Sequence, residues 1–150
     1  MDSGRRYLLR AAAALATLAA LPKAVLAAAW PERAFAATEA KTAMSELLGT
    51  DATVDSDQIM LKVPEIAENG AVVPVTISTT LANVNSISIV VAGNPRPLAA
   101  MFDIPEGTLP EISSRIKMGE TSDVMAVVRT DSGVYSTSKQ VKVTIGGCGG

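Results

Sequence analysis

The sequence predicts an all-β protein, an immunoglobulin-like antiparallel β-sandwich with a short N-terminal helix and a flexible C-terminal arm. From Ile59 onward, apolar residues alternate with polar ones in a series of short runs. Residues that favour turns separate these runs at intervals of roughly 8–15 residues, as is typical of sandwich folds. The chain of 150 residues then ends in a glycine-rich segment, residues 146–150. This length fits one domain once an export leader is subtracted.

Residues 1–36 are predicted to be a twin-arginine export signal. The pair Arg5-Arg6 precedes an apolar run from Ala11 to Leu21, and small residues follow that run. The run has eleven residues, fewer than the roughly 20 that a membrane-spanning helix needs. We therefore expect export of the folded protein to the periplasm. An uncleaved membrane anchor is the alternative.

Two peptide bonds in this leader could be cut. Ala27-Ala28-Ala29 precedes Trp30, and Ala34-Phe35-Ala36 precedes Ala37, so both bonds follow small residues. The later site is preferred because a polar helix start follows it directly. Cleavage there would remove 36 of the 150 residues and leave 114, without the only tryptophan. Missing tryptophan fluorescence in the mature protein would favour this site, and the choice between the two stays open.

Residues 37–145 are predicted to form the domain, beginning with a short helix. Thr38 is expected to cap this helix, and Gly49 to end it. Its apolar positions follow helical spacing and are Ala40, Met44, Leu47 and Leu48. We expect the helix to lie across one end of the domain. Residues 50–58 are expected to form a polar link to the first strand.

Seven strands are predicted from the alternating runs, at residues 59–63, 72–78, 87–91, 98–102, 111–118, 124–128 and 134–145. Pro74 suggests an edge position for the second strand, because proline cannot donate to a neighbouring strand. The unbroken apolar run of the sixth predicts a central strand that is covered on both faces. Asn69-Gly70 and Asp131-Ser132-Gly133 are typical turn sequences.

Composition excludes several classes of function. The chain is only 3% aromatic and carries a net charge of −2, so nucleic acid finds neither stacking platforms nor a basic surface. With no histidine and one cysteine, zinc and copper lack their usual ligands, and no cofactor is predicted. A cysteine nucleophile would also lack a histidine base. These absences favour a carrier subunit over an enzyme.

The C-terminal arm, residues 146–150, contains the only cysteine, Cys148. Glycine loses more backbone entropy on ordering than any other residue, so we expect this arm to be mobile and its thiol exposed. Cys148 is the third residue after Ile145, which allows the sulfur to move about 10 Å from the domain. We predict that Cys148 attaches a group covalently and carries it into other proteins' pockets. The residues predicted to give the arm flexibility and access are Gly146, Gly147, Gly149 and Gly150.

Other interpretations of the terminus remain. It could be a disordered tail without function, or an exported structural β-sandwich could use Cys148 for an intermolecular disulfide. A thiol peroxidase would need a cysteine of lowered pKa at a helix start with a resolving partner, and the sequence shows neither. A thiocarboxylate on Gly150 would need ATP, which an exported chain would not meet.

The ending from Val141 to Gly150 and the earlier segment from Pro64 to Gly70 resemble the SoxY family, a subunit of the periplasmic thiosulfate-oxidising Sox system. The resemblance covers the expected mature chain and extends to the twin-arginine leader. It implies that Cys148 carries the sulfur intermediates of thiosulfate oxidation on a swinging arm.

The resemblance also implies partners. A c-type haem cytochrome joins thiosulfate to the thiol, a manganese hydrolase releases sulfate, and a sulfane dehydrogenase with molybdenum and haem oxidises the sulfur that remains. A SoxZ-type β-sandwich subunit forms a heterodimer with the carrier. The metals and haems belong to these enzymes, and the carrier itself needs none.

Overall fold

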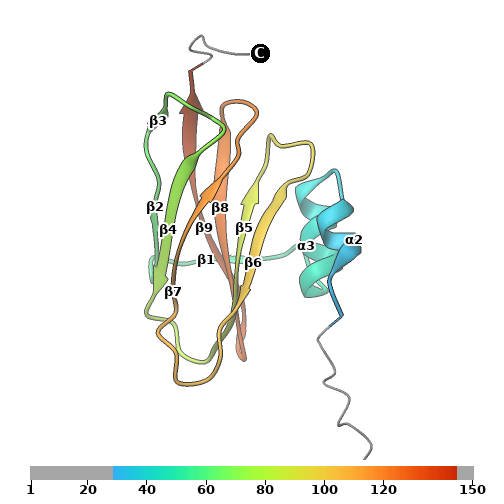
Figure 1. Ribbon diagram of the computed structural model, residues 1–150. Coiled ribbons are helices and arrows are strands. Elements are labelled where there is room, and N and C mark those ends of the chain that lie inside the picture. Colours follow the sequence, from blue (N-terminus) through green and yellow to red (C-terminus); the bar gives the residue numbers. More distant parts are fainter. Residues whose placement is uncertain (1–28, 145–150) are drawn as a thin grey trace, which may run out of the picture. The chain divides into compact units, whose positions relative to one another are not determined.

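The computed structural model describes residues 29–144 of the chain. The chain divides into two compact units, Met1–Trp30 and Pro31–Gly150, and the described helices and strands belong to the second. Two β-sheets pack face to face in this unit, and two short helices precede them in the sequence (Figure 1). The predicted β-sandwich with a short N-terminal helical region is confirmed.

The larger sheet has six strands, in the order β1-β9-β8-β5-β6, with β3 also paired to β9. Its strands are β1 (Val54–Asp55), β3 (Ile66–Ala67), β5 (Val84–Val91), β6 (Leu98–Asp103), β8 (Ser122–Thr130) and β9 (Gly133–Val143). The long strands pair antiparallel, as predicted, whereas β1 and β3 pair parallel with β9. Because β1 and β3 have only two residues each, they leave no alternating pattern in the sequence.

The smaller sheet has three antiparallel strands in the order β2-β4-β7. They are β2 (Ile59–Lys62), β4 (Val73–Thr79) and β7 (Glu111–Ile116). The prediction that Pro74 marks an edge strand is wrong, because β4 is central. The last pair between β2 and β4 joins Lys62 to Thr76, and Pro74 lies two residues beyond it, opposite Arg115 of β7. The missing N–H is tolerated where β4 extends past the end of β2.

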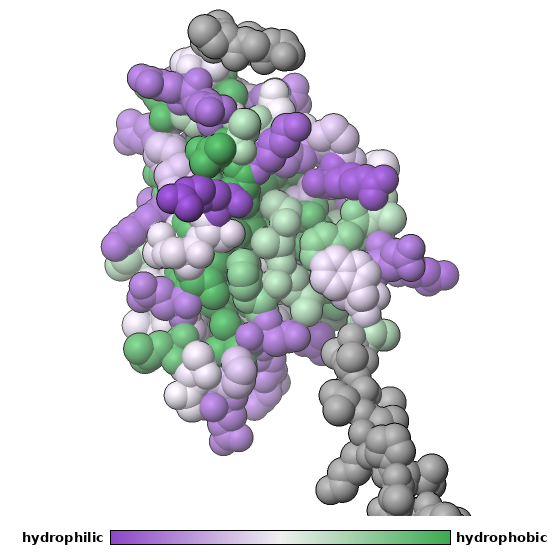
Figure 2. Space-filling view, viewed as in Figure 1, coloured by the Kyte–Doolittle hydropathy of each residue, from purple (hydrophilic) through white to green (hydrophobic). Residues whose placement is uncertain are grey.

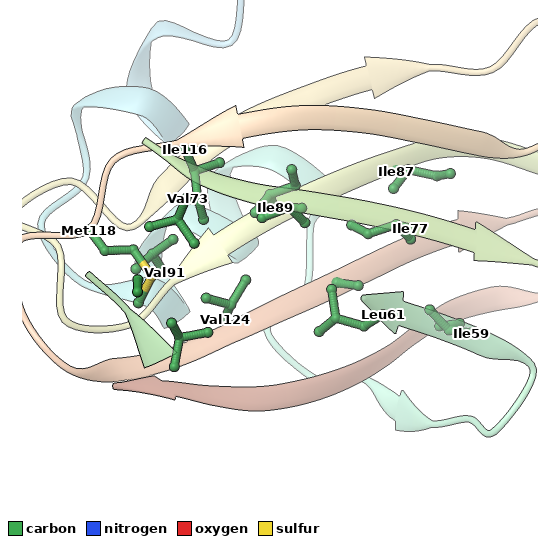
Figure 3. Close-up of a cluster of buried hydrophobic side chains, with 14 of the residues drawn as sticks. Ile59, Leu61, Val73, Ile77, Ile87, Ile89, Val91, Ile116, Met118 and Val124 are labelled. Carbon is green, nitrogen blue, oxygen red and sulfur yellow. The ribbon is translucent and has the colours of Figure 1, made fainter. Parts of the chain in front are cut away.

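An aliphatic core fills the space between the two sheets (Figure 3). Its largest fully buried side chains include Leu61, Ile77, Ile87, Ile89, Val73, Val75, Val91, Val124, Val128 and Val141. Complete burial of one such side chain contributes about 1.5–3 kcal/mol. A core of this kind agrees with the low aromatic content and holds β9 firmly in the sandwich.

The predicted position of β8 is confirmed, because β8 pairs with β9 on one side and β5 on the other. Val124, Ala126 and Val128 face the smaller sheet. Val127 points the other way, towards the helices. Both faces of β8 are therefore covered by protein.

The helices are α2 (Glu32–Ala36) and α3 (Ala40–Leu48), and they cover the outer face of the larger sheet. Ala34, Ala43 and Met44 pack there against Val90, Leu98 and Val127 of the sheet. The prediction that the helix lies across one end of the domain is therefore wrong. The apolar face of the helix packs on the larger sheet because alternate residues of β5 and β8 form an apolar surface on the outer side of that sheet.

The predicted end of α3 is confirmed, whereas its predicted start is wrong. Gly49 ends the helix in the left-handed conformation, with φ of 76°, which favours glycine. The residue that precedes the first turn is Glu39 rather than Thr38, and no side-chain hydrogen bond caps it. Helix α2 was not predicted, since its five residues fall in the segment assigned to the leader.

Candidate functional site at the end of strand β9

The predicted attachment residue Cys148 and its neighbours Gly146, Gly147, Gly149 and Gly150 lie outside the described residues, which end at Thr144. The described part of the site is the end of β9 that leads to them. This end of β9 lies at the same end of the sandwich as β3 (Figure 1). The surroundings of β9 at this point determine how firmly the last described residue, Thr144, is held.

On one edge, β3 pairs with the last residues of β9. Ala67 lies opposite Val143 in a parallel register. The backbone N–H of Lys142 donates to the carbonyl of Glu65 at 3.0 Å, and that of Thr144 donates to the carbonyl of Ala67 at 3.1 Å. Backbone pairing therefore continues to the last described residue.

On the other edge of β9, the side chain of Thr121, which directly precedes the first residue of β8, continues the hydrogen bonding to β9. The last β8–β9 pair joins Ser122 to Val141. Beyond it, the backbone N–H of Val143 donates to Thr121 Oγ1 at 2.9 Å, and the Thr121 hydroxyl donates to the carbonyl of Val143 at 3.5 Å. Val143 is thus held on both sides.

The predicted Asn69-Gly70 turn is confirmed, and it packs against this end of β9. The backbone N–H of Ala71 donates to Asn69 Oδ1 at 2.9 Å, which closes the turn. The backbone N–H of Met118 donates to the carbonyl of Gly70 at 2.7 Å. A Cβ added to Gly70 would lie 2.4 Å from the Met118 carbonyl oxygen and 2.9 Å from Val143 Cγ1. Only glycine fits this close approach without a shift.

A third loop joins the same end of the sandwich. Asn94 donates through Nδ2 to the carbonyl of Lys117 at 2.7 Å and accepts the backbone N–H of Gly119 at 3.0 Å. A Cβ on Gly93 would lie 2.8 Å from Ser122 Cβ. Hydrogen bonds and close packing therefore join the loops that follow β3, β5 and β7 at this end of the sandwich.

The surface at this end combines exposed apolar and charged side chains, which Figure 2 shows side by side. Ile66 is 55% exposed and Val72 is 51% exposed. The exposed charged residues close to them in the sequence or on the adjoining strands are Glu65, Glu68, Lys117, Glu120 and Lys142. A surface of this mixed kind suits transient contact with other proteins.

No metal centre or membrane span is found in the part of the chain that the structure describes. Within residues 29–144, no group of three or more His, Cys, Asp or Glu side chains is placed to hold a metal. No helix in this range is long and apolar enough to cross a bilayer. A hollow of about 400 Å³ lies at the other end of the sandwich, beside Asn83, Glu106 and Asp131.

Sequence reasoning predicted the Asn-Gly turn but missed the elements that brace β9, and its assignment of Cys148 stays a prediction. Strand β3 has too few residues for an alternating pattern to be recognised in the sequence. The hydrogen bonds of Thr121 depend on the register between β8 and β9, which the sequence does not state. Close packing of a turn against a distant strand could have been suspected at Gly70 alone, because glycine permits such an approach.

The family model of sulfur oxidation protein SoxY matches residues 44–148. The sulfur carrier protein SoxY from Chlorobium limicola f thiosulfatophilum is similar in structure, with 38% identity and a TM-score of 0.62 over 69% of this chain and 94% of that chain. A superoxide reductase (neelaredoxin) from Ignicoccus hospitalis has 14% identity and a TM-score of 0.54 over 61% of this chain and 95% of that chain. That second likeness concerns the fold alone. No curated protein sequence matches the chain.

The fold and the site together define a class of protein: a two-sheet β-sandwich whose last strand is braced on both edges just before a cysteine-containing C-terminus. Within that class, the match over residues 44–148 and the 38% identity to the Chlorobium protein place the chain in one family. The chain belongs to the SoxY family of sulfur oxidation proteins.

Proposed function

We propose that this protein is a covalent carrier of sulfur intermediates in thiosulfate oxidation and that the sulfur is bound to the thiol of Cys148. The observation that carries the proposal is the extent of the SoxY match, which runs from residue 44 to residue 148 and so includes this cysteine. The similar protein from Chlorobium is itself described as a sulfur carrier. Cys148 is the only thiol in the chain, which makes it the only candidate for attachment through sulfur.

The geometry at the end of β9 supports an arm made of residues 146–150. Cys148 is the fourth residue after Thr144, and an extended chain spans at most about 3.6 Å per residue, so the two Cα atoms lie within roughly 14 Å of each other. An enzyme that receives the thiol must therefore approach this end of the sandwich. Because Val143 bonds to Thr121 on one edge and its neighbours Lys142 and Thr144 bond to the chain around β3 on the other, the reach of the thiol depends on the glycine-rich residues that follow.

The proposed cycle begins with the oxidative joining of thiosulfate to Cys148. A sulfur–sulfur bond forms between Sγ and the outer sulfur of thiosulfate, the thiol proton is released, and two electrons pass to a c-type haem cytochrome. Water then cleaves the bond to the sulfone group at a manganese hydrolase, which releases sulfate and leaves a persulfide on Cys148. A sulfane dehydrogenase then accepts electrons from the persulfide sulfur while oxygen atoms from water are added to that sulfur and protons are released. A second hydrolysis releases the oxidised sulfur as sulfate and restores the thiol.

The chain's role in this cycle is to present the sulfur and not to catalyse its oxidation. Glycines beside Cys148 add no side-chain bulk, so the arm can enter a narrow channel, and their N–H groups can donate to an anionic adduct. We place the carrier in the periplasm as a heterodimer with a SoxZ-type β-sandwich subunit, after export by the twin-arginine leader. Haem, manganese and molybdenum belong to the enzymes that act on it.

Mass spectrometry of the exported protein tests this proposal. With thiosulfate and the partner enzymes present, we expect a thiosulfonate or persulfide addition on the peptide that contains Cys148. The Cys148→Ser variant should carry no addition and should unfold at the same temperature as the parent, since residue 148 lies beyond the last strand. Turnover of thiosulfate by the chain alone would contradict a carrier role.

The same experiment separates the carrier from its main alternative, an exported structural sandwich linked through an intermolecular disulfide. A structural role predicts that Cys148 is recovered only in a disulfide-linked dimer, with no sulfur addition in the presence of the enzymes. Recovery of dimer alone would therefore refute the proposal.

A further inference from the structure

Helix α2 belongs to the folded domain, although the sequence places it inside the leader. Ala34 is 1% exposed and Ala37 is 9% exposed, and both lie in the apolar cluster under the helices. Phe35 packs against the same cluster. The compact unit that contains the sandwich begins at Pro31, directly before α2. The helix therefore covers the larger sheet as part of one fold with it.

The two bonds that a leader peptidase could cut differ in their surroundings. The bond between Ala36 and Ala37 lies at the end of α2, where the backbone N–H of Ala37 donates to the carbonyl of Arg33 at 3.1 Å. Three residues before that bond, Ala34 is buried. The bond between Ala29 and Trp30, in contrast, lies outside any helix, and both of its residues are exposed.

This difference between the two bonds matters because we expect the exported protein to fold before its leader is cleaved. A twin-arginine leader predicts export of a folded protein, so the peptidase meets α2 after it has packed on the sheet. Enzymes and receptors that bind peptides as an added strand need an extended backbone with accessible side chains. Cleavage after Ala36 would require α2 to unwind and Ala34 to leave the apolar cluster. Cleavage after Ala29 requires neither change.

We propose that the leader is removed between Ala29 and Trp30 and that α2 is retained in the mature protein. Water is added across this bond, which leaves a carboxylate on Ala29 and a free amino group on Trp30. Removal of 29 of the 150 residues gives a mature chain of 121 that keeps the only tryptophan. This inference depends on the export leader but not on the sulfur-carrier function, so either can fail without the other.

The N-terminal sequence and intact mass of the exported protein test the proposal directly. The full chain, with its leader, is produced in a bacterium that has twin-arginine export, and the periplasmic form is purified. We expect an N-terminus at Trp30 and tryptophan fluorescence from the mature protein. An N-terminus at Ala37 or at any other residue, or an uncleaved chain, would overturn the proposal.

A matched pair of substitutions identifies the bond independently. Ala29→Leu places a large residue immediately before the proposed bond and should block processing, so that the precursor accumulates. Ala36→Leu makes the same change before the other bond, at an exposed position of α2, and should leave processing unchanged. The reverse pattern, with processing blocked only by Ala36→Leu, would refute the assignment.

Stability measurements on two chains check the retained helix. A chain that starts at Trp30 should unfold at a higher temperature than one that starts at Ala37, by about 4 °C or more, because only the longer chain covers Val90 and Leu98 with α2. Equal unfolding temperatures would show that α2 adds nothing to the domain and would remove the physical basis of the proposal.

Discussion

Thr121 bonds to both polar backbone groups of Val143, accepting its N–H at 2.9 Å and donating to its carbonyl at 3.5 Å. The Thr121 side chain thus makes the two hydrogen bonds to β9 that the backbone of a neighbouring strand normally makes. Strand β8 begins only at Ser122, so without Thr121 this edge of β9 would end its pairing two residues earlier. Hydrogen bonding on this edge of β9 therefore continues as far as Val143.

Replacement of Thr121 by valine should loosen the end of β9 at nearly constant side-chain volume. We expect a loss of about 0.5–1.5 kcal/mol in the free energy of unfolding, since the Val143 N–H loses its acceptor. Amide hydrogen exchange at Val143 should become faster, while exchange in the middle of β9 stays the same. Thr108→Val, at an exposed position in the loop between β6 and β7, is the control. Equal exchange at Val143 in parent and variant would show that Thr121 does not brace the strand.

Gly70→Ala should destabilise the protein by about 1–3 kcal/mol, because the new Cβ would lie 2.4 Å from the Met118 carbonyl oxygen and 2.9 Å from Val143 Cγ1. Gly119→Ala is a matched control in the adjacent loop, since its Cβ would meet only Asn94 Oδ1, at 3.9 Å. Urea unfolding of the two variants measures the difference. The packing explanation fails if both variants unfold at the same urea concentration.

Ile66→Glu should impair transfer of sulfur to the partner enzymes without unfolding the carrier. Ile66 is 55% exposed and lies opposite Lys142 near the end of β9, on the surface that a receiving enzyme must approach. We expect a several-fold lower kcat/KM for the carrier as substrate of the hydrolase. Leu109→Glu is the control, because Leu109 is 82% exposed in the loop between β6 and β7, away from β9's end (Figure 1). An equal effect of the two variants would argue against docking at this end.

Ser88→Ala should stabilise the domain by about 1 kcal/mol. The Ser88 side-chain oxygen is buried without a hydrogen-bond partner among the described residues, and removal of an unsatisfied hydroxyl is favourable. Ser136→Ala should have the opposite effect, because Ser136 Oγ and Thr53 Oγ1 are 2.7 Å apart and share a hydrogen bond. Thermal unfolding compares the two variants. A stability loss in Ser88→Ala would mean that its hydroxyl has a partner after all.

The long strands could be predicted because each buries alternate residues over enough length to leave a pattern. Strand β9 is the clearest case, since apolar Val141 and Val143 alternate with Lys142 up to the end of the pairing. The serines of β5 show the limit of this reasoning. Ser88 is 1% exposed and shares its face of β5 with Val90, which lies in the apolar cluster under the helices, so a serine in an alternating strand is here buried and not exposed to water.

The sequence predicts a chemistry for the site, which stays a prediction, but it does not predict the contacts that support the end of β9. The lone thiol among glycines identifies Cys148 as a candidate for attachment from composition alone. The contacts that brace β9 join residues far apart in the sequence, such as Gly70 and Met118. Contacts of this kind depend on the register between strands, and no local pattern encodes them.

Because β9 follows all the other described strands in the sequence and yet pairs with β1, β3 and β8, the domain cannot finish folding before β9 has been synthesised. A polypeptide released early lacks the buried Val141, and its strands β1, β3 and β8 have no β9 to pair with. Any export route that accepts only folded cargo would then reject such fragments. A complete sandwich therefore contains β9, so translation of such a chain has come within a few residues of Cys148.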